Sequence, residues 1–343
     1  MRGLDRLPRV SLVRAPTPLE DAPRLAAALG VRRLLVKRED LTDLALGGNK
    51  VRKLEFLFGE ALAQQADTIV TTASAHSNFL RIVSAGARRF GLRPVLLVRG
   101  RPDLPSEGNL LLMRLFAERI IYLDTEDPYA EGTIARMRDV EQELRRSGRR
   151  PYLIHLAAFS AGLATAAYVP AAEELAAQLR ERGGGCDRIV LAVGSGGTHA
   201  GLLLGLRAAG VAAPVLGASV NTGAGEMRRR IRDQIRAAED LLGLAPSVRD
   251  DEIEITDAHV GPGYGIPTAD SLAAVALAAR TEGLLLDPIY TGKAWAALAH
   301  AVRAGAVRPS ETVVFMHTGG APNTFVHSAE IAGALSAAAN AEA

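Results

Sequence analysis

The sequence is poor in cysteine and in aromatic residues, and it has no long apolar run. Cys186 is the only cysteine among the 343 residues, which excludes an internal disulfide and any metal cluster held by cysteines alone. The apolar run SLAAVALAA (271–279) is much shorter than the roughly 18 residues that a membrane helix requires. We therefore expect a globular protein with no membrane span and no metal site.

Neither sign of charge is in excess. The 40 Lys and Arg residues nearly balance the 38 Asp and Glu residues, for a formal net charge of +2. Proteins that bind nucleic acid usually concentrate positive charge on one face, so we expect no nucleic-acid partner. The first 21 residues carry scattered charges and lack the continuous apolar segment of a secretory signal. These features predict a soluble protein of the cytoplasm.

Short apolar segments alternate along the chain with Ala, Leu and Arg-rich segments of helical spacing. Eight of the short segments are typical of strands: 32–40, 67–73, 93–100, 119–124, 151–156, 188–194, 214–220 and 312–320. This alternation predicts an α/β fold with parallel sheets covered by helices on both faces, and the length allows two domains. Ligands bind beyond the carboxyl ends of such strands, so we expect the functional residues in the loops that follow them.

Lysine is rare in this chain. Of the 40 basic residues only four are lysines, at positions 37, 50, 53 and 293, and two of these lie in ALGGNKVRKLEFL (45–57). Gly47 and Gly48 predict a flexible turn, with Asn49 as the cap of a helix that begins near Lys50. The helix dipole disfavours a cation at a helix start. A lysine at this position therefore calls for a reason.

The chemistry of amines supplies such a reason. An amine forms an imine with a carbonyl group, which a guanidinium cannot do, and a lysine near the positive end of a helix loses its proton more readily. Lys53 lies one turn further along and is placed to contact the same bound anion. The alternative for Lys50, taken by itself, is a solvated surface lysine.

The segment LAVGSGGTHAGLLLGL (191–206) joins a predicted strand to a predicted helix. Its loop residues are Gly194, Ser195, Gly196, Gly197 and Thr198. Glycines let the backbone approach an anion closely, and the first N–H groups of the helix face it, so the segment predicts a phosphate site. It lacks the Gly-Lys-Ser/Thr end of a nucleotide P-loop, and Ala200 replaces the last glycine of the dinucleotide pattern. A tight turn without a ligand is the alternative.

Further candidates lie in other loops. Ser77 and Asn78 follow a predicted strand in TTASAHSNFLRIV, where they either cap the next helix or bind a substrate carboxylate. Tyr264, Tyr290 and Thr318 lie beside glycine or proline in GPGYGIP, LLLDPIYTGKAW and VVFMHTGGAPNTF. A tyrosine in such a loop is more often a packing residue than a functional one. Without histidine pairs at metal-ligand spacing or a Gly-x-Ser-x-Gly motif, metal and serine-hydrolase chemistry are not expected.

Together these segments resemble the pyridoxal-phosphate-dependent enzymes of the tryptophan synthase β-type fold, and within them the D-cysteine desulfhydrase and aminocyclopropane-carboxylate deaminase family. LGGNKVRKLEFL is similar to the cofactor-lysine motif of that family, GSGGTHAGL to its phosphate loop, and GPGYGIP, EGLLLDPIYTGKA and HTGGAP to its C-terminal signatures. The resemblance extends from about Pro16 to about Phe325.

The resemblance implies a two-domain, open twisted parallel-sheet fold, known as pyridoxal-phosphate fold type II. A large domain would comprise residues 1–50 and 161–343, and a small inserted α/β domain residues 51–160. The cofactor, pyridoxal 5′-phosphate, would lie between the two domains. The resemblance also implies a homodimer.

Roles for the motif residues follow from the same resemblance. It implies that Lys50 is in Schiff-base linkage to the cofactor, while Lys53 and the loop 194–198 hold the phosphate. Asn78 would contact the 3′ oxygen of the ring, and Thr318 would lie near the pyridine nitrogen.

For the substrate, a small amino acid, the resemblance implies contacts with four residues. Ser77 would bind the substrate carboxylate or carry a proton in transit, beside Asn78. Tyr264 and Tyr290 would flank the substrate.

The chain departs from the family pattern at two places. His76 and Phe79 stand where the family commonly has glutamine before Ser-Asn and histidine after it. The segment LAAFSAGLATAAY has Ala157, Ala158 and Phe159 where glycines and serine are expected, with one apparent extra residue. Lost glycine N–H groups and added bulk reshape a pocket. We therefore expect His76 and Phe159 beside the substrate, whose identity these changes put in question.

The implied reaction is α,β-elimination on a cysteine-like amino acid, yielding pyruvate, ammonia and sulfide or another thiol. The nearest alternative is 1-aminocyclopropane-1-carboxylate deaminase, but such deaminases resemble YEGK where this chain has Thr291 in YTGK. An L-cysteate sulfo-lyase or another specialised carbon–sulfur lyase stays open because of His76 and the altered segment 157–162. From a different class, a dinucleotide-dependent oxidoreductase and a catalytically silent binding protein are alternatives.

Overall fold

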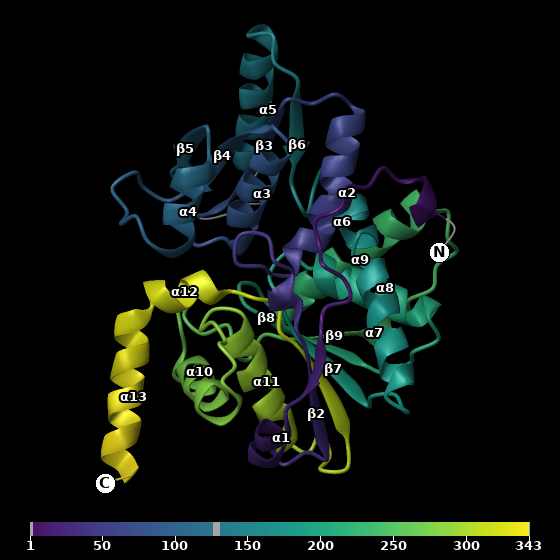
Figure 1. Cartoon of the computed structure of the whole chain (residues 1–343), viewed down its shortest axis with the longest axis vertical. Coiled ribbons are helices and arrows are strands. Elements are labelled where there is room, and N and C mark those ends of the chain that lie inside the picture. The colour runs from purple at the N-terminus through teal and green to yellow at the C-terminus, as the bar shows by residue number, and fades with distance from the viewer. Residues whose placement is uncertain (1–2, 126–130, 343) are drawn as a thin grey trace.

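Two separate sheets organise the chain (Figure 1), which a computed structural model describes at residues 3–125 and 131–342. The six-stranded sheet has the order β1-β2-β10-β7-β8-β9 and the four-stranded sheet the order β5-β4-β3-β6. Among the described strands, only the pairing of β1 with β2 is antiparallel. The strands are β1 (Leu19–Asp21), β2 (Arg33–Lys37), β3 (Thr68–Ser74), β4 (Arg93–Arg99), β5 (Arg119–Leu123), β6 (Pro151–Ile154), β7 (Arg188–Val193), β8 (Val215–Ser219), β9 (Ile253–Thr256) and β10 (Thr312–Met316).

All eight strands predicted from the sequence are present, and the α/β class is confirmed. The sequence prediction missed β1 and β9, which are the two edge strands of the six-stranded sheet. β1 reads Leu-Glu-Asp and β9 reads Ile-Glu-Ile-Thr, so both are too short and too polar to stand out, and pairing with a neighbour holds them in place. The strands of the smaller sheet all lie within 68–154. The domain boundaries at 50/51 and 160/161 stay a prediction.

Helices cover both faces of the six-stranded sheet (Figure 1). One face packs against α7 (Val169–Glu181), α8 (Gly197–Ala208) and α9 (Ala224–Leu242), and the other against α1 (Pro23–Leu29), α10 (Ala269–Glu282) and α11 (Thr291–Arg303). Successive residues of β10 alternate between these faces: Val314 and Met316 pack with the first group, and Val313 and Phe315 with the second. Burial on both faces explains the continuous apolar run of this strand.

The four-stranded sheet is covered in the same way. Its helices are α2 (Lys50–Ala63), α3 (Asn78–Arg89) and α4 (Gly108–Phe116) on one face and α5 (Glu131–Arg146) on the other. The remaining helices are α6 (Ala161–Ala166), α12 (Ala321–Val326) and α13 (Ser328–Glu342), with 3-10 turns at Leu4–Arg6, Glu39–Leu41 and Asp250–Glu252. Over the described ranges, no helix combines the length and apolarity needed to cross a bilayer.

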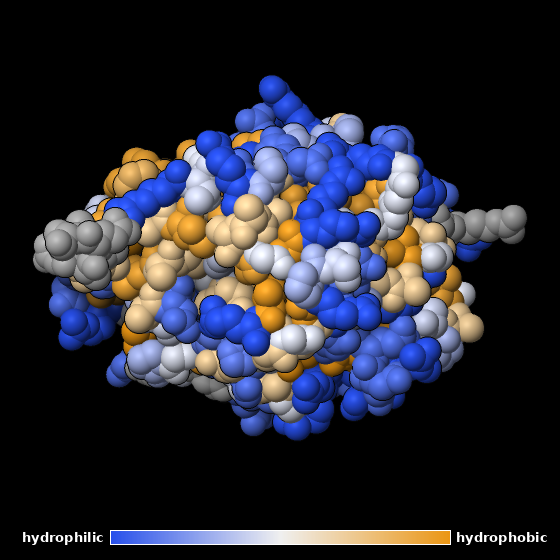
Figure 2. Space-filling model, turned by 90° about the horizontal axis from the view of Figure 1, so that it is seen from below, coloured by the Kyte–Doolittle hydropathy of each residue, from blue (hydrophilic) through white to orange (hydrophobic). Residues whose placement is uncertain are grey.

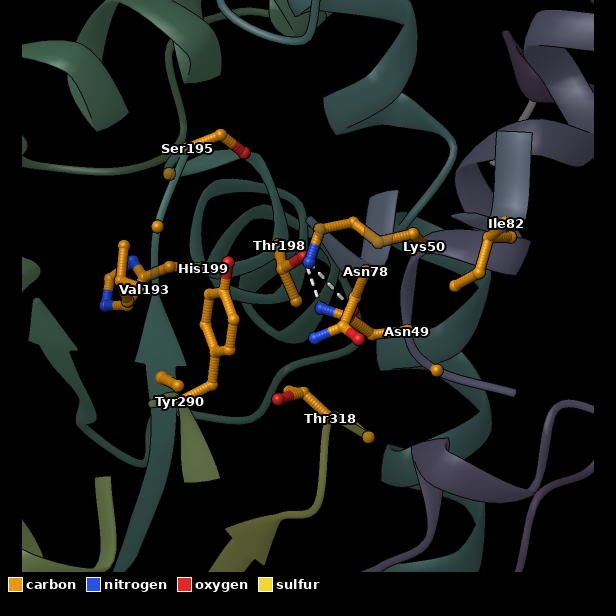
Figure 3. Close-up of a pocket in the computed structure, with 15 residues that line it drawn as sticks. Asn49, Lys50, Asn78, Ile82, Val193, Ser195, Thr198, His199, Tyr290 and Thr318 are labelled. Atoms are coloured by element: carbon orange, nitrogen blue, oxygen red, sulfur yellow. Dashed lines mark hydrogen bonds between the residues drawn. The ribbon is translucent and has the colours of Figure 1, made fainter. Parts of the chain in front are cut away.

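The carboxyl ends of three parallel strands carry candidate residues from both sheets. β3 leads to Ser77 and Asn78 at the start of α3, β7 leads into the loop 194–198 before α8, and β10 leads to Thr318. Asn78 begins the helix that follows β3 of the smaller sheet, yet it lines the same cavity as the loop 194–198 and Thr318 (Figure 3). The fold thus brings the two sheets' carboxyl ends to one place, as the general rule for such sheets predicts.

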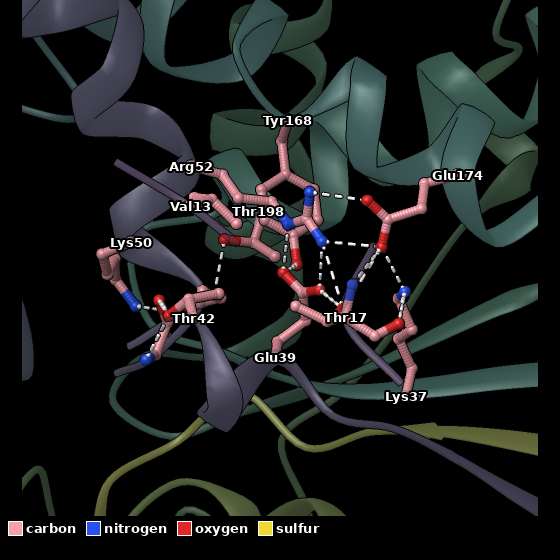
Figure 4. A network of polar contacts seen from close by, with 12 residues as sticks. Val13, Thr17, Lys37, Glu39, Thr42, Lys50, Arg52, Tyr168, Glu174 and Thr198 are labelled. Carbon is pink, nitrogen blue, oxygen red and sulfur yellow. Dashed lines mark hydrogen bonds and ion pairs between the residues drawn. The ribbon is translucent and has the colours of Figure 1, made fainter. Parts of the chain in front are cut away.

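A buried ionic network anchors α2, the helix that begins with Lys50 (Figure 4). Arg52 donates to Glu39 at 2.6 Å and to Glu174 at 2.9 Å, and Lys37 also donates to Glu174. The hydroxyl of Tyr168 donates to Glu39 at 2.8 Å. Burial by itself raises the pKa of the Glu39 carboxyl, but Arg52 and Lys37 outweigh it and hold this pKa below its usual value. Two cations and two carboxylates therefore compensate one another inside the protein.

Candidate active site

A strained turn delivers Lys50 to the start of α2. Leu46, Gly47 and Gly48 all have positive φ, at 69°, 62° and 126°. A Cβ on Gly47 would lie 1.9 Å from the carbonyl oxygen of Asp40, so only glycine fits there. The Gly48 N–H donates to the hydroxyl of Thr42 at 2.8 Å. The backbone before the helix is thus held in one conformation.

Asn49 does not cap the helix, contrary to the sequence prediction. Its backbone is helical and its side chain makes no capping hydrogen bond. Instead its Nδ2 donates to the hydroxyl of Thr198 at 2.9 Å, and its Oδ1 accepts from Lys50 Nζ at 3.0 Å (Figure 3). The amide therefore links the lysine to the glycine-rich loop, a contact between distant segments that local sequence preferences do not report.

The surroundings of Lys50 favour its neutral form. Burial and the nearby Arg81 guanidinium lower its pKa to about 8, against an opposing effect of Asp287. The amine also lies 6.0 Å from the centre of the Tyr290 ring. An amine with this pKa is partly unprotonated near neutral pH and can act as a nucleophile or a base.

Lys53 is a fully buried cation without a partner. Within the described part of the chain its Nζ donates no hydrogen bond. Burial, and then the charge of Lys50, push its pKa well below the usual value. A buried ammonium of this kind is costly unless an anion pairs with it. The site is therefore built for a negatively charged group.

The glycine-rich loop supplies the rest of an anion cradle. Gly196 has a φ of 95°, a backbone conformation that favours glycine, and a Cβ on Gly197 would lie 2.9 Å from Lys53 Nζ. Gly197 also begins α8, whose first N–H groups and positive dipole end attract anions. Together with the orphaned Lys53 ammonium, this cradle fits the phosphate group of a cofactor.

Two adjoining cavities hold most of the predicted residues. The first is lined by the loop residues Gly194, Ser195, Gly196 and Thr198 together with Lys50, Asn78, Tyr290 and Thr318 (Figure 3). The second, of about 390 Å³, adds Ser77, Phe79 and Tyr264. Lys50, Asn78 and Tyr290 line both. One amine thus faces the anion cradle on one side and a space large enough for an amino acid on the other.

Two tyrosines form a hydroxyl pair at the second cavity. The Tyr264 and Tyr290 hydroxyls are hydrogen-bonded to each other, and Ser74 Oγ lies 3.3 Å from the Tyr264 hydroxyl. The loop of Tyr290 is fixed by Asp287, whose carboxylate accepts the N–H groups of residues 289 to 291. A loop held by Asp287 therefore positions Tyr290, and both tyrosines line the second cavity.

Ser77 has the structural role that the sequence predicted and also reaches the cavity. Its Oγ accepts the N–H of Leu80 at 3.3 Å and caps α3. It lines the second cavity next to Asn78, the first residue of the helix. The helix start is therefore available to a carboxylate.

His76 and Phe159 line neither of the two cavities. The His76 ring lies 6.4 Å from that of His327, and Phe159 is 41% exposed with Arg138 over its ring. Phe159 also packs edge-on against His155, with 6.3 Å between the ring centres, and His155 lines the second cavity, so the expected contact of these two residues with the substrate stays a prediction. Phe79 is the departure from the family pattern that does reach the second cavity.

Other residues at the site were missed from the sequence. The Nε2 of Gln234 donates to the Ser195 carbonyl at 2.8 Å, while its Oε1 and the Thr165 hydroxyl have no partner in the described structure. Gln234 interrupts the buried stripe of α9, next to Ile231 and Ile235. A polar residue in an apolar stripe is a signal that helical spacing could have found.

Comparisons with known proteins agree with this geometry. The family model of pyridoxal-phosphate-dependent enzymes matches residues 10–319. The D-cysteine desulfhydrases of Klebsiella pneumoniae and Salmonella choleraesuis are each 38% identical over 333 residues, which is 95% of this chain and 98% of each relative.

Solved structures agree as well. The crystal structure of an ACC deaminase homologue has a TM-score of 0.88 and 34% identity, covering 97% of this chain and 98% of the other. An L-serine ammonia-lyase from Rhizomucor miehei, with a TM-score of 0.65 and 19% identity over 94% of this chain and 98% of that chain, shares the fold. With its buried amine, its anion cradle and these likenesses along nearly the full length, the chain belongs to the pyridoxal-phosphate-dependent enzyme family.

Proposed function

We propose that this enzyme is a carbon–sulfur lyase that eliminates sulfide from D-cysteine or a closely similar amino acid. With one water consumed in releasing the ammonia, the products would be pyruvate, ammonia and sulfide or another thiol. One observation carries the proposal: the Lys50 amine, with a pKa of about 8, shares a cavity with the hydrogen-bonded pair Tyr264 and Tyr290. The likeness to D-cysteine desulfhydrases over 95% of the chain supports it.

Five sets of atoms would hold pyridoxal phosphate. We propose covalent attachment through Lys50 Nζ, with the phosphate held by the Lys53 ammonium and the N–H groups of the loop 194–198. Asn78 would donate to the ring oxygen, and Thr318 would lie beside the ring nitrogen. When bound, the cofactor's ring withdraws electrons from the substrate's Cα.

The chain's own residues would move the protons. The neutral Lys50 amine would accept the proton from the substrate's Cα at its Nζ. As the bond between Cβ and sulfur breaks, the sulfur leaves with the bonding electrons and takes a proton from the Tyr264–Tyr290 pair. Ser77 and the N–H groups at the start of α3 would hold the substrate carboxylate.

Deamination of 1-aminocyclopropane-1-carboxylate is the second candidate, because the ACC deaminase homologue has the same fold at 34% identity. The surroundings of Thr291 argue against deaminase activity. This residue is fully buried, its hydroxyl bonds to Asp287 at 2.8 Å, and it lines neither cavity. The position at which deaminases of that kind resemble YEGK thus contributes no reactive group here.

A substrate panel tests the proposed function. The purified enzyme, loaded with pyridoxal phosphate, is incubated with D-cysteine, L-cysteine, L-cysteate and 1-aminocyclopropane-1-carboxylate, and pyruvate, 2-oxobutyrate, sulfide and sulfite are measured. We expect pyruvate and sulfide from D-cysteine at the highest kcat/KM. Production of 2-oxobutyrate alone would establish the deaminase instead, and sulfite from L-cysteate a sulfo-lyase. An enzyme that binds the cofactor but converts none of the four would contradict the proposal.

Gly197→Ala should weaken binding of pyridoxal phosphate by about tenfold or more, because the new Cβ would lie 2.9 Å from Lys53 Nζ, in the space of the phosphate. Fluorescence titration of the apoprotein measures the dissociation constant. Gly184→Ala is the matched control, since a Cβ there meets nothing within 4 Å. Equal dissociation constants for the two variants would show that the cradle is not where the phosphate binds.

We also propose that the chain forms a homodimer and works in the cytoplasm, as the family resemblance implies. Figure 2 shows apolar residues between hydrophilic ones on the face seen from below, and large exposed apolar patches are typical of surfaces that contact another protein. Light scattering after size-exclusion chromatography tests the dimer, and cell fractionation tests the location. A monomer at micromolar concentration would contradict the first part.

A further inference from the structure

Arg81, in the middle of α3, is a buried cation without a counter-charge. It is 0% exposed, and no carboxylate of the described residues forms an ion pair with it. Its guanidinium donates only to neutral oxygens: the backbone carbonyls of Ala45 and Gly47 and the amide oxygens of Asn109 and Asn78. Burying an unpaired charge is costly. The position therefore calls for a function beyond packing.

The first task of Arg81 is to hold the turn before Lys50. It binds the carbonyls on both sides of Leu46, with a 3.0 Å bond to Gly47. Ala45 and Leu46 are non-glycine residues with positive φ, at 46° and 69°, a conformation that persists only where the surroundings enforce it. The planar fork of a guanidinium can hold two carbonyls at once.

Arg81 also contributes to the orientation of the Asn78 amide. Its Oδ1 accepts from Asn109 Nδ2 at 3.0 Å and from Arg81 Nη2 at 3.4 Å. Rotating the amide by 180° would set its NH₂ group against two donors. The Oδ1 therefore faces Arg81, and the Nδ2 of Asn78 is left to donate into the cavity that this residue lines.

Asn109 completes this arrangement. Its Oδ1 accepts from Arg81 Nε at 2.8 Å, which fixes its own amide. Besides Asn78, its Nδ2 lies within hydrogen-bond distance of the His76 carbonyl, at 2.9 Å, and of the Oδ1 of Asn323 on α12, at 3.0 Å. The orientation of Asn78 is thus tied through one network to a helix near the C-terminus.

We propose that Arg81, assisted by Asn109, is a positioning residue that presents the Lys50 amine and the Asn78 amide nitrogen to bound pyridoxal phosphate. This inference rests on the proposed function, because it assigns to those two residues the contacts given there. Arg81 touches neither cavity and acts only through its partners.

The charge of Arg81 adds an electrostatic consequence. The charged groups that shift the pKa of Lys50 are the cationic Arg81 and the anionic Asp287. The second buried lysine, Lys53, has its own pKa lowered by burial and by Lys50, and the centre of the Tyr290 ring lies 6.0 Å from the Lys50 amine. Removing a neighbouring positive charge raises the pKa of an amine. Loss of Arg81 should therefore leave less neutral Lys50 amine at pH 7.

The test measures the rate at which the apoprotein combines with pyridoxal phosphate, from pH 6 to pH 10, and the dissociation constant. In the wild type the rate should rise with a midpoint near pH 8. In Arg81→Met we expect a higher midpoint, a rate at pH 7 about tenfold lower, and a dissociation constant raised about tenfold by the loss of one oriented hydrogen bond. Arg81→Lys should restore the midpoint but not the dissociation constant.

Two further variants complete the experiment. Arg88→Met is the matched control, because Arg88 lies on the same helix and donates to the carbonyl of Phe116 at 2.7 Å, away from both cavities; it should behave as the wild type. Asn109→Leu keeps the charge of Arg81 but removes a donor to Asn78, so it should weaken cofactor binding about tenfold without moving the midpoint. If Arg81→Met does not fold, the dissociation constant of Asn109→Leu tests the proposal in its place.

The outcomes separate the two proposals. Folded Arg81→Met with the wild-type midpoint and dissociation constant, or Asn109→Leu with the wild-type dissociation constant, would overturn the positioning role. A lowered melting temperature alone would show that Arg81 only stabilises the fold, which also overturns it. A wild type that forms no covalent bond with the cofactor at Lys50 would instead overturn the proposed site itself.

Discussion

Replacing Lys50 by arginine should abolish covalent attachment of pyridoxal phosphate and lower the rate of elimination by about 10⁴-fold. Arginine keeps the positive charge at the start of α2, but a guanidinium forms no imine and does not give up its proton. Lys50→Ala should have the same effect on both measurements. The absorption spectrum of the cofactor-loaded protein and the elimination rate with D-cysteine measure the loss.

Mapping the lysine to which pyridoxal phosphate is attached tests this prediction more directly. The chain has only four lysines, so borohydride reduction followed by peptide mapping can distinguish them without ambiguity. Lys50 lines both cavities, while Lys53 and Lys293 line neither. We expect the pyridoxyl group on Lys50 alone in the wild type and on no residue in Lys50→Arg. An adduct on Lys53 in the wild type would exchange the roles of the two lysines.

Glu39→Gln should destabilise the protein by about 3–5 kcal/mol, the usual effect of removing one partner from a buried ion pair. Glu39 is fully buried, and its loss would leave the cations Arg52 and Lys37 with only Glu174 between them. Urea denaturation of the apoprotein at pH 7 measures the free energy of unfolding.

An exposed ion pair provides the control for this prediction. Asp251 and Arg249 are paired at 3.0 Å with both side chains 72% exposed, so Asp251→Asn should change the free energy of unfolding by less than about 1 kcal/mol. If Glu39→Gln were as stable as Asp251→Asn, the network below α2 would not be what holds that helix in place.

The pH dependence of stability has a definite sign here. Burial raises and the neighbouring cations lower the pKa of Glu39 and Glu174, and the net effect lowers both below the ordinary value of 4.5. A carboxyl whose pKa is lower in the folded state stabilises the fold above its unfolded pKa, and this stabilisation is lost as the pH falls through the folded value. The wild type should therefore lose stability below about pH 4.5, and Glu39→Gln should lose less over the same range.

Much of the site was predictable because its residues lie in short segments with their own chemistry. A lysine at a helix start among arginines, and glycines between a strand and a helix, are local signals, and the structure places Lys50 and the loop 194–198 at one cavity. The strands buried on both faces were predictable for the same reason, because a continuous apolar run such as that of β10 is a local sequence signal of such a strand.

Other features depend on contacts between distant segments. Asn49 was expected to cap a helix but bonds to Thr198, which is 149 positions away. His76 and Phe159 follow strands, as ligand-binding residues often do, yet their side chains turn to His327 and Arg138. Neighbouring residues in the sequence do not decide which of two directions such a side chain takes, because the packing around it does.

The sequence by itself determined the alternation of strands and helices, and it indicated Lys50 and the glycine-rich loop 194–198 as candidates, since each follows from the spacing of neighbouring residues and from side-chain chemistry. Only the tertiary structure decided that Lys53 and Arg81 are buried with no carboxylate partner among the described residues, and that Arg81 and Asn109 donate to the amide oxygen of Asn78. The reason is physical: burial and hydrogen-bond partners depend on which distant segments the fold brings together, and these quantities set the charge and the orientation of the groups at the site.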